Sequence, residues 1–193
     1  KQLGVEFNTN VRFGRDIDIV SLKKSGYHAI FLGIGAHHAL PLGIKGQDMK
    51  NSFNAISFLR EVSLGKTFAM GKRVVVIGGG FTAIDSARTA LRLGAEEVFI
   101  LYRRTRDEMP VEQSEITEAE EEGIKIMYLV SPQEIIGNGK VEKIRLLNYV
   151  LGERDASDRR RPVEVPGTEF MLAVDTVIAA LGQDVKMDFG QDI

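Results

Sequence analysis

A fully apolar run over 74–77, followed directly by three glycines and then by a helical pattern, constrains the fold more than any other feature. Consecutive β-branched residues are typical of a parallel strand that is covered on both faces. Apolar residues then recur at helical spacing from Ala83 to Leu91, and Gly94 follows where helices commonly end. These features predict a strand, a glycine turn and a helix.

The next segments continue the alternation of strand and helix. The sequence predicts a second buried strand over 98–102, an acidic helix between Pro110 and Gly123, and a third strand over 124–129. This order is typical of a parallel α/β sheet. The fold class that we expect is therefore α/β, with a Rossmann-like parallel sheet.

Beyond Pro132 the pattern changes. Two predicted strands, 141–150 and 162–171, flank a polar loop over 152–161, and the spacing favours a β-hairpin or meander over another crossover helix. A final apolar run over 174–182 ends in glycine and predicts a return to a buried strand.

The segment before the central pattern is less regular. Alternation over 5–11 predicts a short strand, and the apolar run 29–32, closed by glycines, predicts a buried strand. Helical spacing follows over 52–64, and a polar stretch bounded by glycine, 66–71, resembles a linker.

Composition excludes several classes of protein. The chain has 193 residues, a formal charge of −2 and 44% hydrophobic residues, which excludes a disordered or fibrous chain. The near-neutral charge argues against nucleic-acid binding, and no apolar run approaches the roughly 20 residues of a membrane helix. Cysteine is absent, so the chain itself can hold no disulfide and no cysteine-ligated iron–sulfur cluster.

The two ends of the sequence suggest a piece of a longer protein. The first residue is Lys1, and the last residues stop in the middle of a pattern. No signal peptide is visible, and we expect a cytoplasmic location.

The glycine turn has the spacing Gly78-x-Gly80-x-x-Ala83 between an apolar strand and a helix. The first glycine permits a tight turn, the second lets the backbone approach a pyrophosphate, and the small third residue lets helix and strand pack closely. The N-terminus of the helix offers free N–H groups and a partial positive charge to phosphates. The sequence therefore predicts a dinucleotide site. The alternative is a glycine turn that has only a structural role.

The end of the second strand distinguishes between nicotinamide cofactors. An NAD site usually carries an acidic residue there, whereas arginine accommodates the 2′-phosphate of NADP. This chain has Arg103, Arg104 and Arg106 at that place. Arginine pairs with phosphate through charge-assisted hydrogen bonds, so we expect NADP(H). The alternative is a solvated basic turn that balances the acidic helix.

Other motifs are weaker. Gly65-Lys66-Thr67 resembles the end of a P-loop, but Arg60 stands where that loop needs glycine. The pair His37-His38 lacks an accompanying carboxylate cluster, so we interpret it as part of a loop. The run 159–161 lies beside acidic residues and predicts a solvated hairpin tip. No Tyr-x-x-x-Lys pair and no Ser/His/acid set suggests a general acid or base, so we predict no catalytic side chain.

In their order along the chain, several phrases resemble the small (beta) subunit family of bacterial glutamate synthase, with relatives in the flavoprotein part of dihydropyrimidine dehydrogenase and in the bifurcating ferredoxin–NADP oxidoreductase. The resemblance covers nearly the whole chain. The segments that carry it are Gly4 to Phe7, Phe31 to Ala36, Gly71 to Gly80, Thr82 to Asp85, Ala87 to Ala90, Arg92 to Val98, Leu101 to Pro110, Asp155 to Pro162 and Ala173 to Gln183.

The resemblance implies an NAD(P)H domain inserted into an FAD domain, which is only partial here. The implied divisions are 1–46, part of the FAD domain; 47–71, a linker with a helix; 72–182, the NAD(P)H domain; and 183–193, a return to the FAD domain. NADPH would pass hydride to the flavin, and electrons would leave through iron–sulfur centres outside this chain. A larger catalytic subunit or an electron-acceptor protein is the implied partner.

The same match implies roles for individual residues. The pyrophosphate cradle would be Gly78, Gly79, Gly80, Phe81, Thr82 and Ala83. Arg103 and Arg104 would take the 2′-phosphate, Ala180, Leu181 and Gly182 would lie near the nicotinamide, and Gly33, Gly35 and Ala36 near FAD.

Two positions depart from the family pattern. Phe81 stands where the family has Asn or Asp, so a polar contact is lost or the ring stacks in place of the incoming nicotinamide; Ser86 stands where many relatives have Cys. The family's first FAD fingerprint is also missing, which puts FAD binding by this piece alone in doubt. Rival interpretations are a module that senses NADP(H) without turnover, a methyltransferase-like domain, and a piece kept only for subunit contact.

Overall fold

The computed structural model describes residues 3–156 and 158–185. Contacts divide the chain into two compact units: unit 1 is 1–38 with 183–193, and unit 2 is 39–182. Most of the predicted return segment 183–193 lies outside the described residues. All the predicted elements of the α/β sheet fall in unit 2.

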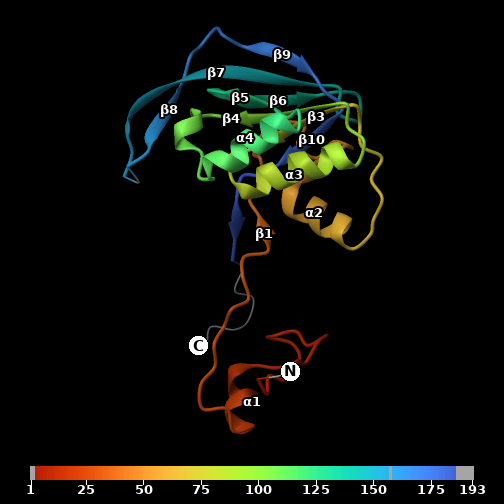
Figure 1. Ribbon diagram of the computed structural model, residues 1–193, viewed down its shortest axis with the longest axis vertical. Coiled ribbons are helices and arrows are strands. Elements are labelled where there is room, and N and C mark those ends of the chain that lie inside the picture. Colours follow the sequence, from red (N-terminus) through yellow and green to blue (C-terminus); the bar gives the residue numbers. More distant parts are fainter. Residues whose placement is uncertain (1–2, 157, 186–193) are drawn as a thin grey trace. The chain divides into compact units, whose positions relative to one another are not determined.

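A parallel five-stranded sheet forms the centre of unit 2 (Figure 1). Its strands, in their order across the sheet, are β2 (Ser52–Asn54), β10 (Thr176–Ala179), β3 (Arg73–Ile77), β4 (Glu97–Tyr102) and β5 (Lys125–Tyr128). Each neighbouring pair is parallel. The predicted Rossmann-like sheet is therefore confirmed.

Three helices cover one face of this sheet (Figure 1). They are α2 (Ala55–Ser63), α3 (Phe81–Arg92) and α4 (Gln113–Glu121), and a short 3₁₀ helix, η1 (Arg106–Glu108), precedes α4. Val74 and Val76 of β3 are fully buried against these helices, whereas Val75 and Ile77 belong to the core on the opposite face. A continuous apolar strand is needed because the sheet is covered on both faces.

An antiparallel sheet covers that opposite face (Figure 1). It consists of β6 (Val130–Ile136), β7 (Lys143–Arg154), β8 (Arg160–Glu164) and β9 (Phe170–Ala173). The first part of β7 pairs with β9 and its last part pairs with β8. The predicted hairpin or meander excursion is confirmed, and unit 2 has three layers: helices, parallel sheet and antiparallel sheet.

Two details of this excursion correct the prediction. The single strand expected over 162–171 is two strands, because the chain turns between β8 and β9, where the Val165 amide donates to the Asn148 carbonyl at 3.0 Å. No pattern in the sequence predicted β6. Pro132 suggested a break, but it lies inside β6 next to an irregularity in the pairing, a place where strands tolerate proline.

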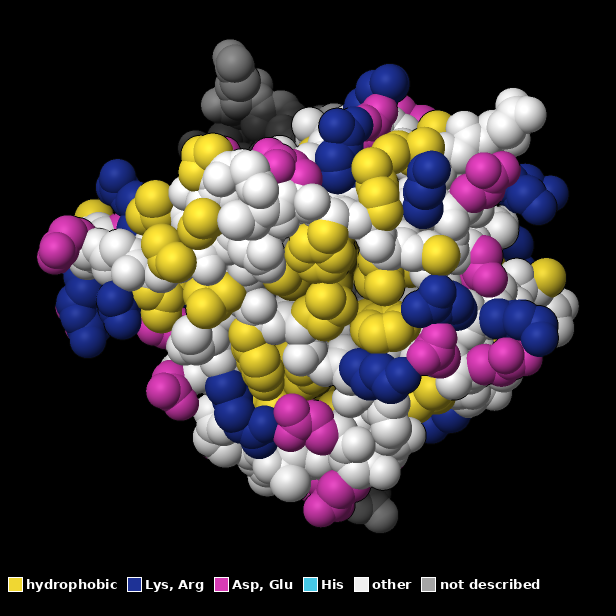
Figure 2. Space-filling view, turned by 90° about the horizontal axis from the view of Figure 1, so that it is seen from above, with side chains coloured by type: hydrophobic (Ala, Val, Ile, Leu, Met, Phe, Trp, Pro, Cys, Tyr) yellow, Lys and Arg dark blue, Asp and Glu magenta, His cyan; other side chains and the backbone are white. Residues whose placement is uncertain are grey.

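The outer face of the antiparallel sheet is partly apolar. Leu172 packs into the core, so its neighbour Met171 points to the other face, where it is 52% exposed. Figure 2 views the molecule from this side and shows apolar side chains gathered in the middle, with charged side chains around them.

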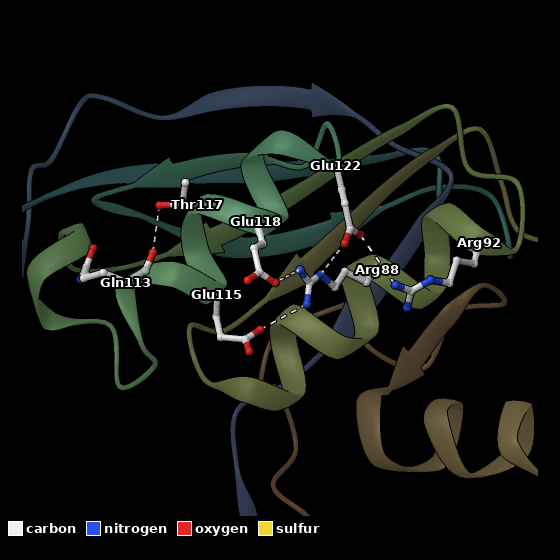
Figure 3. A network of polar contacts seen from close by, with 7 residues as sticks. All are labelled: Arg88, Arg92, Gln113, Glu115, Thr117, Glu118 and Glu122. Carbon is white, nitrogen blue, oxygen red and sulfur yellow. Dashed lines mark hydrogen bonds and ion pairs between the residues drawn. The ribbon is translucent and has the colours of Figure 1, made fainter.

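Arg88 joins α3 to α4 through charge (Figure 3). Its guanidinium lies 3.2 Å from Glu115, 3.0 Å from Glu118 and 3.0 Å from Glu122, and its side chain is only 14% exposed. Neighbouring Arg92 is exposed and lies 3.9 Å from Glu122. The acidic helix predicted between Pro110 and Gly123 is therefore tied to the preceding helix mainly through Arg88.

Unit 1 contains little regular structure. Its helix α1 (Ile19–Lys24) begins with a capping box between Asp18 and Ser21 and buries none of its residues. The strands predicted over 5–11 and 29–32 are wrong: neither forms, and Phe31 is 94% exposed. A strand needs a hydrogen-bonding neighbour, and within the described residues these runs have none.

The boundaries of the elements near residue 50 also differ from the prediction. The helix expected over 52–64 begins at Ala55, because the Asn54 side chain accepts from the Ile56 amide and caps it. Ser52–Asn54 forms β2, which pairs with β10, so the segment 47–71 contributes a strand to the sheet and is not merely a linker. The short strands β1 (His38–Ala39) and β11 (Gln183–Asp184) pair with each other.

Candidate functional site: the glycine turn and its hollow

The glycine turn begins where β3 ends, and Gly78 cannot be replaced there without strain. Its φ is +142°, and a Cβ at this position would collide with the carbonyl oxygen of Ala180. The Gly78 amide donates to Leu101 at 3.0 Å, and the Ala180 amide donates to Ile77 at 2.8 Å. The turn is therefore pressed against the ends of both neighbouring strands.

Gly79 and Gly80 lack side chains for different reasons. A Cβ on Gly79 would lie 2.5 Å from the ring of Tyr102, so the protein itself excludes one. Gly80 has a φ of −94°, which any residue adopts, and no atom lies within 4 Å of its Cβ position. The protein therefore leaves open the space beside Gly80.

The N-terminus of α3 faces this open space. Gly80 is its N-cap and makes no side-chain cap hydrogen bond. The amides of Ala83 and Ile84 donate to the Gly80 carbonyl at 2.9 and 3.2 Å, and the amides before them have no acceptor within the helix. Their N–H groups and the helix dipole suit an anion.

The remaining residues predicted for the cradle behave differently from one another. Ala83 is fully buried and lets α3 pack closely on the sheet. Thr82 lines the hollow described below, but Phe81 is not among the lining residues, and its ring is 53% exposed. Buried Ser86 donates to the Thr82 carbonyl at 2.7 Å and has a packing role.

A hollow of about 520 Å³ lies at the carboxyl ends of the central strands. Its volume falls within the range of small-molecule sites. It opens where β3 and β10 are neighbours and the chain order reverses, which is where open α/β sheets bind ligands. Its walls come from Leu40, Pro41, Leu42, Ile44, Ile77, Gly78, Gly79, Gly80, Thr82, Leu101, Tyr102, Arg103, Arg104, Pro110, Val130, Ser131, Pro132, Arg159, Ala180, Leu181 and Gly182.

The three predicted arginines have three different environments. Arg103 is exposed and lines the hollow. Arg104 also lines it, but its side chain is 6% exposed, and its guanidinium donates to the Arg160 carbonyl at 2.8 Å and to Asp155 at 3.3 Å. Arg106 is not a lining residue.

Arg106 is held by the acidic helix α4. Its guanidinium donates to Gln113 at 2.8 Å, to Thr117 at 2.9 Å and to Glu120 at 2.6 Å. The hydrogen bond to Glu120 is the main reason why the pKa of Arg106 is raised. This arrangement corresponds to the alternative that we considered for the whole basic turn, a turn that balances the acidic helix.

The segment after β10 closes the hollow. Ala180, Leu181 and Gly182 all line it, and Gly182 has a φ of +114°. The Gly182 carbonyl accepts from the Leu40 amide at 3.1 Å, which brings the apolar segment Leu40–Ile44 into the wall. The sequence pattern gave no signal for that segment.

Gly33, Gly35 and Ala36 belong to unit 1 and are not lining residues of the hollow. They lie in a stretch without regular structure, where Gly35 has a φ of +68°. The neighbouring His37 ring lies 2.6 Å from the Ile34 carbonyl in a loop, as we expected, but His38 lies in the short strand β1. The proposed contacts of these residues with FAD remain a prediction.

Sequence reasoning missed the contribution of Arg159. We interpreted the run 159–161 as a solvated tip, and all three residues are exposed, but Arg159 also lines the hollow. The run itself was visible in the sequence; the pairing that brings it to the end of β4 was not.

Two kinds of feature are absent from residues 3–156 and 158–185. In that part of the chain, no helix is both long and apolar enough to cross a membrane. Over the same residues, no cluster of three or more histidine or acidic side chains is arranged to hold a metal ion.

Comparison with known proteins gives a consistent result. The family model described as pyridine nucleotide-disulphide oxidoreductase matches residues 3–192. The chain is 45% identical over 195 residues to the NADPH-Fe(3+) oxidoreductase subunit beta of Geobacter sulfurreducens, covering 98% of this chain and 29% of that protein. It is 38% identical over 193 residues to the glutamate synthase [NADPH] small chain of Escherichia coli K12, covering 93% and 41% respectively.

The chain therefore spans less than half the length of these relatives, and the resemblance to the glutamate synthase small subunit is confirmed. Among solved structures, Mycobacterium tuberculosis FprA in complex with NADPH matches with a TM-score of 0.75 and 23% identity, covering 90% of this chain and 54% of that one. This similarity concerns the fold.

Proposed function

The chain belongs to the pyridine nucleotide-disulphide oxidoreductase family, and on that premise we propose that unit 2 binds NADPH in the hollow beside the glycine turn. One observation carries this proposal. Gly80 adopts a backbone conformation open to any residue, yet it has no side chain and no atom within 4 Å of its Cβ position. A ligand whose phosphates approach the backbone explains that open space.

The residues of the turn would divide the work of binding. The N–H groups at the start of α3 would donate to the pyrophosphate, and Thr82 would add a hydroxyl at the same wall. Gly78 and Gly79 would keep the turn close to the strand ends, and Ala83 would keep the helix close to the sheet.

Arg103 would select the phosphorylated cofactor. It is exposed at the end of β4 and lines the hollow, so its guanidinium can pair with a 2′-phosphate. Arg106 is left out of this role because three side chains of α4 already hold its guanidinium. Discrimination between NADPH and NADH would rest on the arginines that line the hollow.

The reaction class that we propose is NADPH-dependent flavoprotein oxidoreduction. A bound flavin would supply the acceptor for the hydride of the nicotinamide. Ala180, Leu181 and Gly182 would guide the nicotinamide out of the hollow, and Gly33, Gly35 and Ala36 would contact FAD. No side chain of the chain needs to act as acid or base, which fits the absence of such a set from the sequence.

The rest of the enzyme is also a proposal. Relatives named as a beta subunit and as a small chain suggest a larger partner or an electron-acceptor protein. Iron–sulfur centres outside this chain would carry the electrons onward, and the cytoplasmic location stays a prediction. The divisions 1–46 and 183–193 would be parts of an FAD domain.

Titration of the full-length protein with NADPH and with NADH tests the proposal. We expect NADPH to bind at least ten-fold more tightly, because only NADPH offers Arg103 a 2′-phosphate. Equal affinities would contradict the proposed selection of the 2′-phosphate by the arginines that line the hollow. If neither nucleotide bound, the proposal as a whole would be contradicted. Reduction of a dye by NADPH would separate an oxidoreductase from a module that only senses the nucleotide.

A further inference from the structure

The tip of the β7–β8 hairpin reaches the arginine end of the hollow. Arg159, just before β8, lines the hollow together with Arg103 and Arg104. The hairpin comes from a distant part of the chain: Arg104 and Arg160 are 56 positions apart. Three arginines from two distant segments therefore line the same hollow.

Arg104 is hydrogen-bonded to the hairpin. Its Nε donates to the Arg160 carbonyl at 2.8 Å, and a terminal nitrogen donates to Oδ2 of Asp155 at 3.3 Å. The side chains of this ion pair are 6% and 25% exposed. Because its charge is already paired and largely buried, Arg104 is poorly placed to turn toward a ligand.

The two acceptors of Arg104 stand on either side of Arg159. Asp155 closes the tip: its amide donates to the Arg159 carbonyl at 2.8 Å, and its Oδ1 accepts from the Arg159 amide at 3.4 Å. Arg160 follows directly in the chain. The guanidinium of Arg104 therefore holds the side chain of Asp155 before Arg159 and the backbone of Arg160 after it.

The charge of Arg159 acts at the end of β4. Burial raises the pKa of Tyr102, while the positive charges of Arg104 and Arg159 both pull that pKa down. Tyr102 lies against the glycine turn, since a Cβ on Gly79 would meet its ring. The charge of the hairpin is thus felt at the wall of the hollow.

We propose that Arg159 is the second cationic contact for the 2′-phosphate, beside Arg103, and that Arg104 is a positioning residue that holds the hairpin in place for it. This inference rests on the proposed binding of NADPH. It replaces the expectation that adjacent Arg103 and Arg104 act as the phosphate-binding pair. Specificity for the phosphorylated cofactor then depends on two segments far apart in the sequence.

Calorimetric titration with adenosine 2′,5′-bisphosphate and with adenosine 5′-phosphate tests the role of Arg159, using variants of the full-length protein. We expect Arg159→Ala to weaken the bisphosphate at least ten-fold and to change the 5′-phosphate less than two-fold. Arg161→Ala is the matched control, because Arg161 carries the same charge on the same hairpin but does not line the hollow. It should leave both affinities unchanged.

A double-mutant cycle tests the positioning role. If Arg104 acts through Arg159, then Arg104→Ala weakens the bisphosphate in the wild-type background but adds less than a two-fold loss in the Arg159→Ala background. A direct contact from Arg104 to the phosphate would make the two losses multiply. That result would overturn the positioning role.

The outcomes separate this inference from the proposed function. Wild-type protein that binds the two nucleotides equally would contradict the proposed selectivity for a 2′-phosphate. Wild-type protein that prefers the bisphosphate, together with an Arg159→Ala variant that keeps this preference, would overturn only the role of Arg159. The comparison of Arg159→Ala with Arg161→Ala decides this even where Arg104→Ala fails to fold.

Discussion

The turn after β3 and the turn after β4 lie next to each other at the carboxyl edge of the sheet, and they are held in different ways. The glycine turn is shaped by the backbone: Gly78 and Gly79 are pressed against Ala180 and Tyr102, and Gly80 borders open space. The arginine turn is shaped by side chains from elsewhere. The hairpin holds Arg104, and α4 holds Arg106.

This difference shows which structural features a local sequence pattern can predict. A glycine pattern describes the local conformation of the backbone, so its spacing is enough to predict the turn. A run of arginines gives only charge, and the partners that each guanidinium meets are decided by tertiary pairing. Three of the four predictions below disturb one turn or the other, starting with the largest expected effect, and the last changes a charge contact outside both turns.

Gly78→Ala breaks the glycine turn. The positive φ and the collision with the Ala180 carbonyl should lower the free energy of unfolding by about 3 kcal/mol. Urea denaturation measures this loss. Gly94→Ala is the matched control: Gly94 also has a positive φ, +99°, but no atom lies within 4 Å of its Cβ position. A loss no larger than that of the control would mean that the contact with Ala180 is unimportant.

Arg103→Ala disturbs the arginine turn without disturbing the fold. Arg103 is exposed, and loss of a charge-assisted contact with phosphate should weaken NADPH by about 1.5–3 kcal/mol. NADH has no 2′-phosphate, so its affinity should change less than two-fold. Parallel titrations with the two nucleotides check this result. An equal loss for both would mean that Arg103 contacts a group common to them.

Gly80→Ala separates binding from stability within the glycine turn. With a φ of −94° and no atom within 4 Å of the Cβ position, the added methyl group fits, and the free energy of unfolding should fall by no more than about 1 kcal/mol, because alanine is a poorer N-cap than glycine. Affinity for both NADPH and NADH should fall at least ten-fold, because the methyl group occupies the space of the pyrophosphate. Unchanged affinity would mean that the open space beside Gly80 does not hold the pyrophosphate, and the proposed function would lose its main support.

The same contrast explains what the sequence could and could not predict. The run 74–77 and the spacing from Gly78 to Ala83 sufficed for the strand, the turn and the helix, because each is specified locally. The position of Arg104 was also visible, but its partner Asp155 lies 51 positions away, across a strand pairing that no local pattern encodes. Arg159 was read as a solvated tip for the same reason.

Unit 1 shows the opposite failure. Its apolar run 29–32 has the composition of a buried strand, but within the described residues no strand pairs with it, and Phe31 stays exposed. Burial and pairing, and not composition alone, turn an apolar run into a strand.

The prediction with the smallest expected effect concerns Arg88. Like Arg104, Arg88 is held by residues of another element, and its replacement tests whether such an arginine can have a structural role only. Arg88 lies away from the hollow and pairs with Glu115 and Glu118 of α4 and with Glu122 directly after it (Figure 3). Arg88→Met should lower the free energy of unfolding by about 1 kcal/mol, because solvent screens the partly exposed glutamates.

Arg92→Met is its control. Arg92 is 67% exposed and lies 3.9 Å from Glu122, so its loss should stay within about 0.5 kcal/mol. Neither variant should change the ratio of NADPH to NADH affinity, since neither residue lines the hollow. A changed ratio in Arg88→Met alone would mean that a shift of α4 moves Arg106 and, with it, the arginine turn. The arginine turn would then take part in nucleotide selection through its contacts with α4 and not only through the arginines that line the hollow.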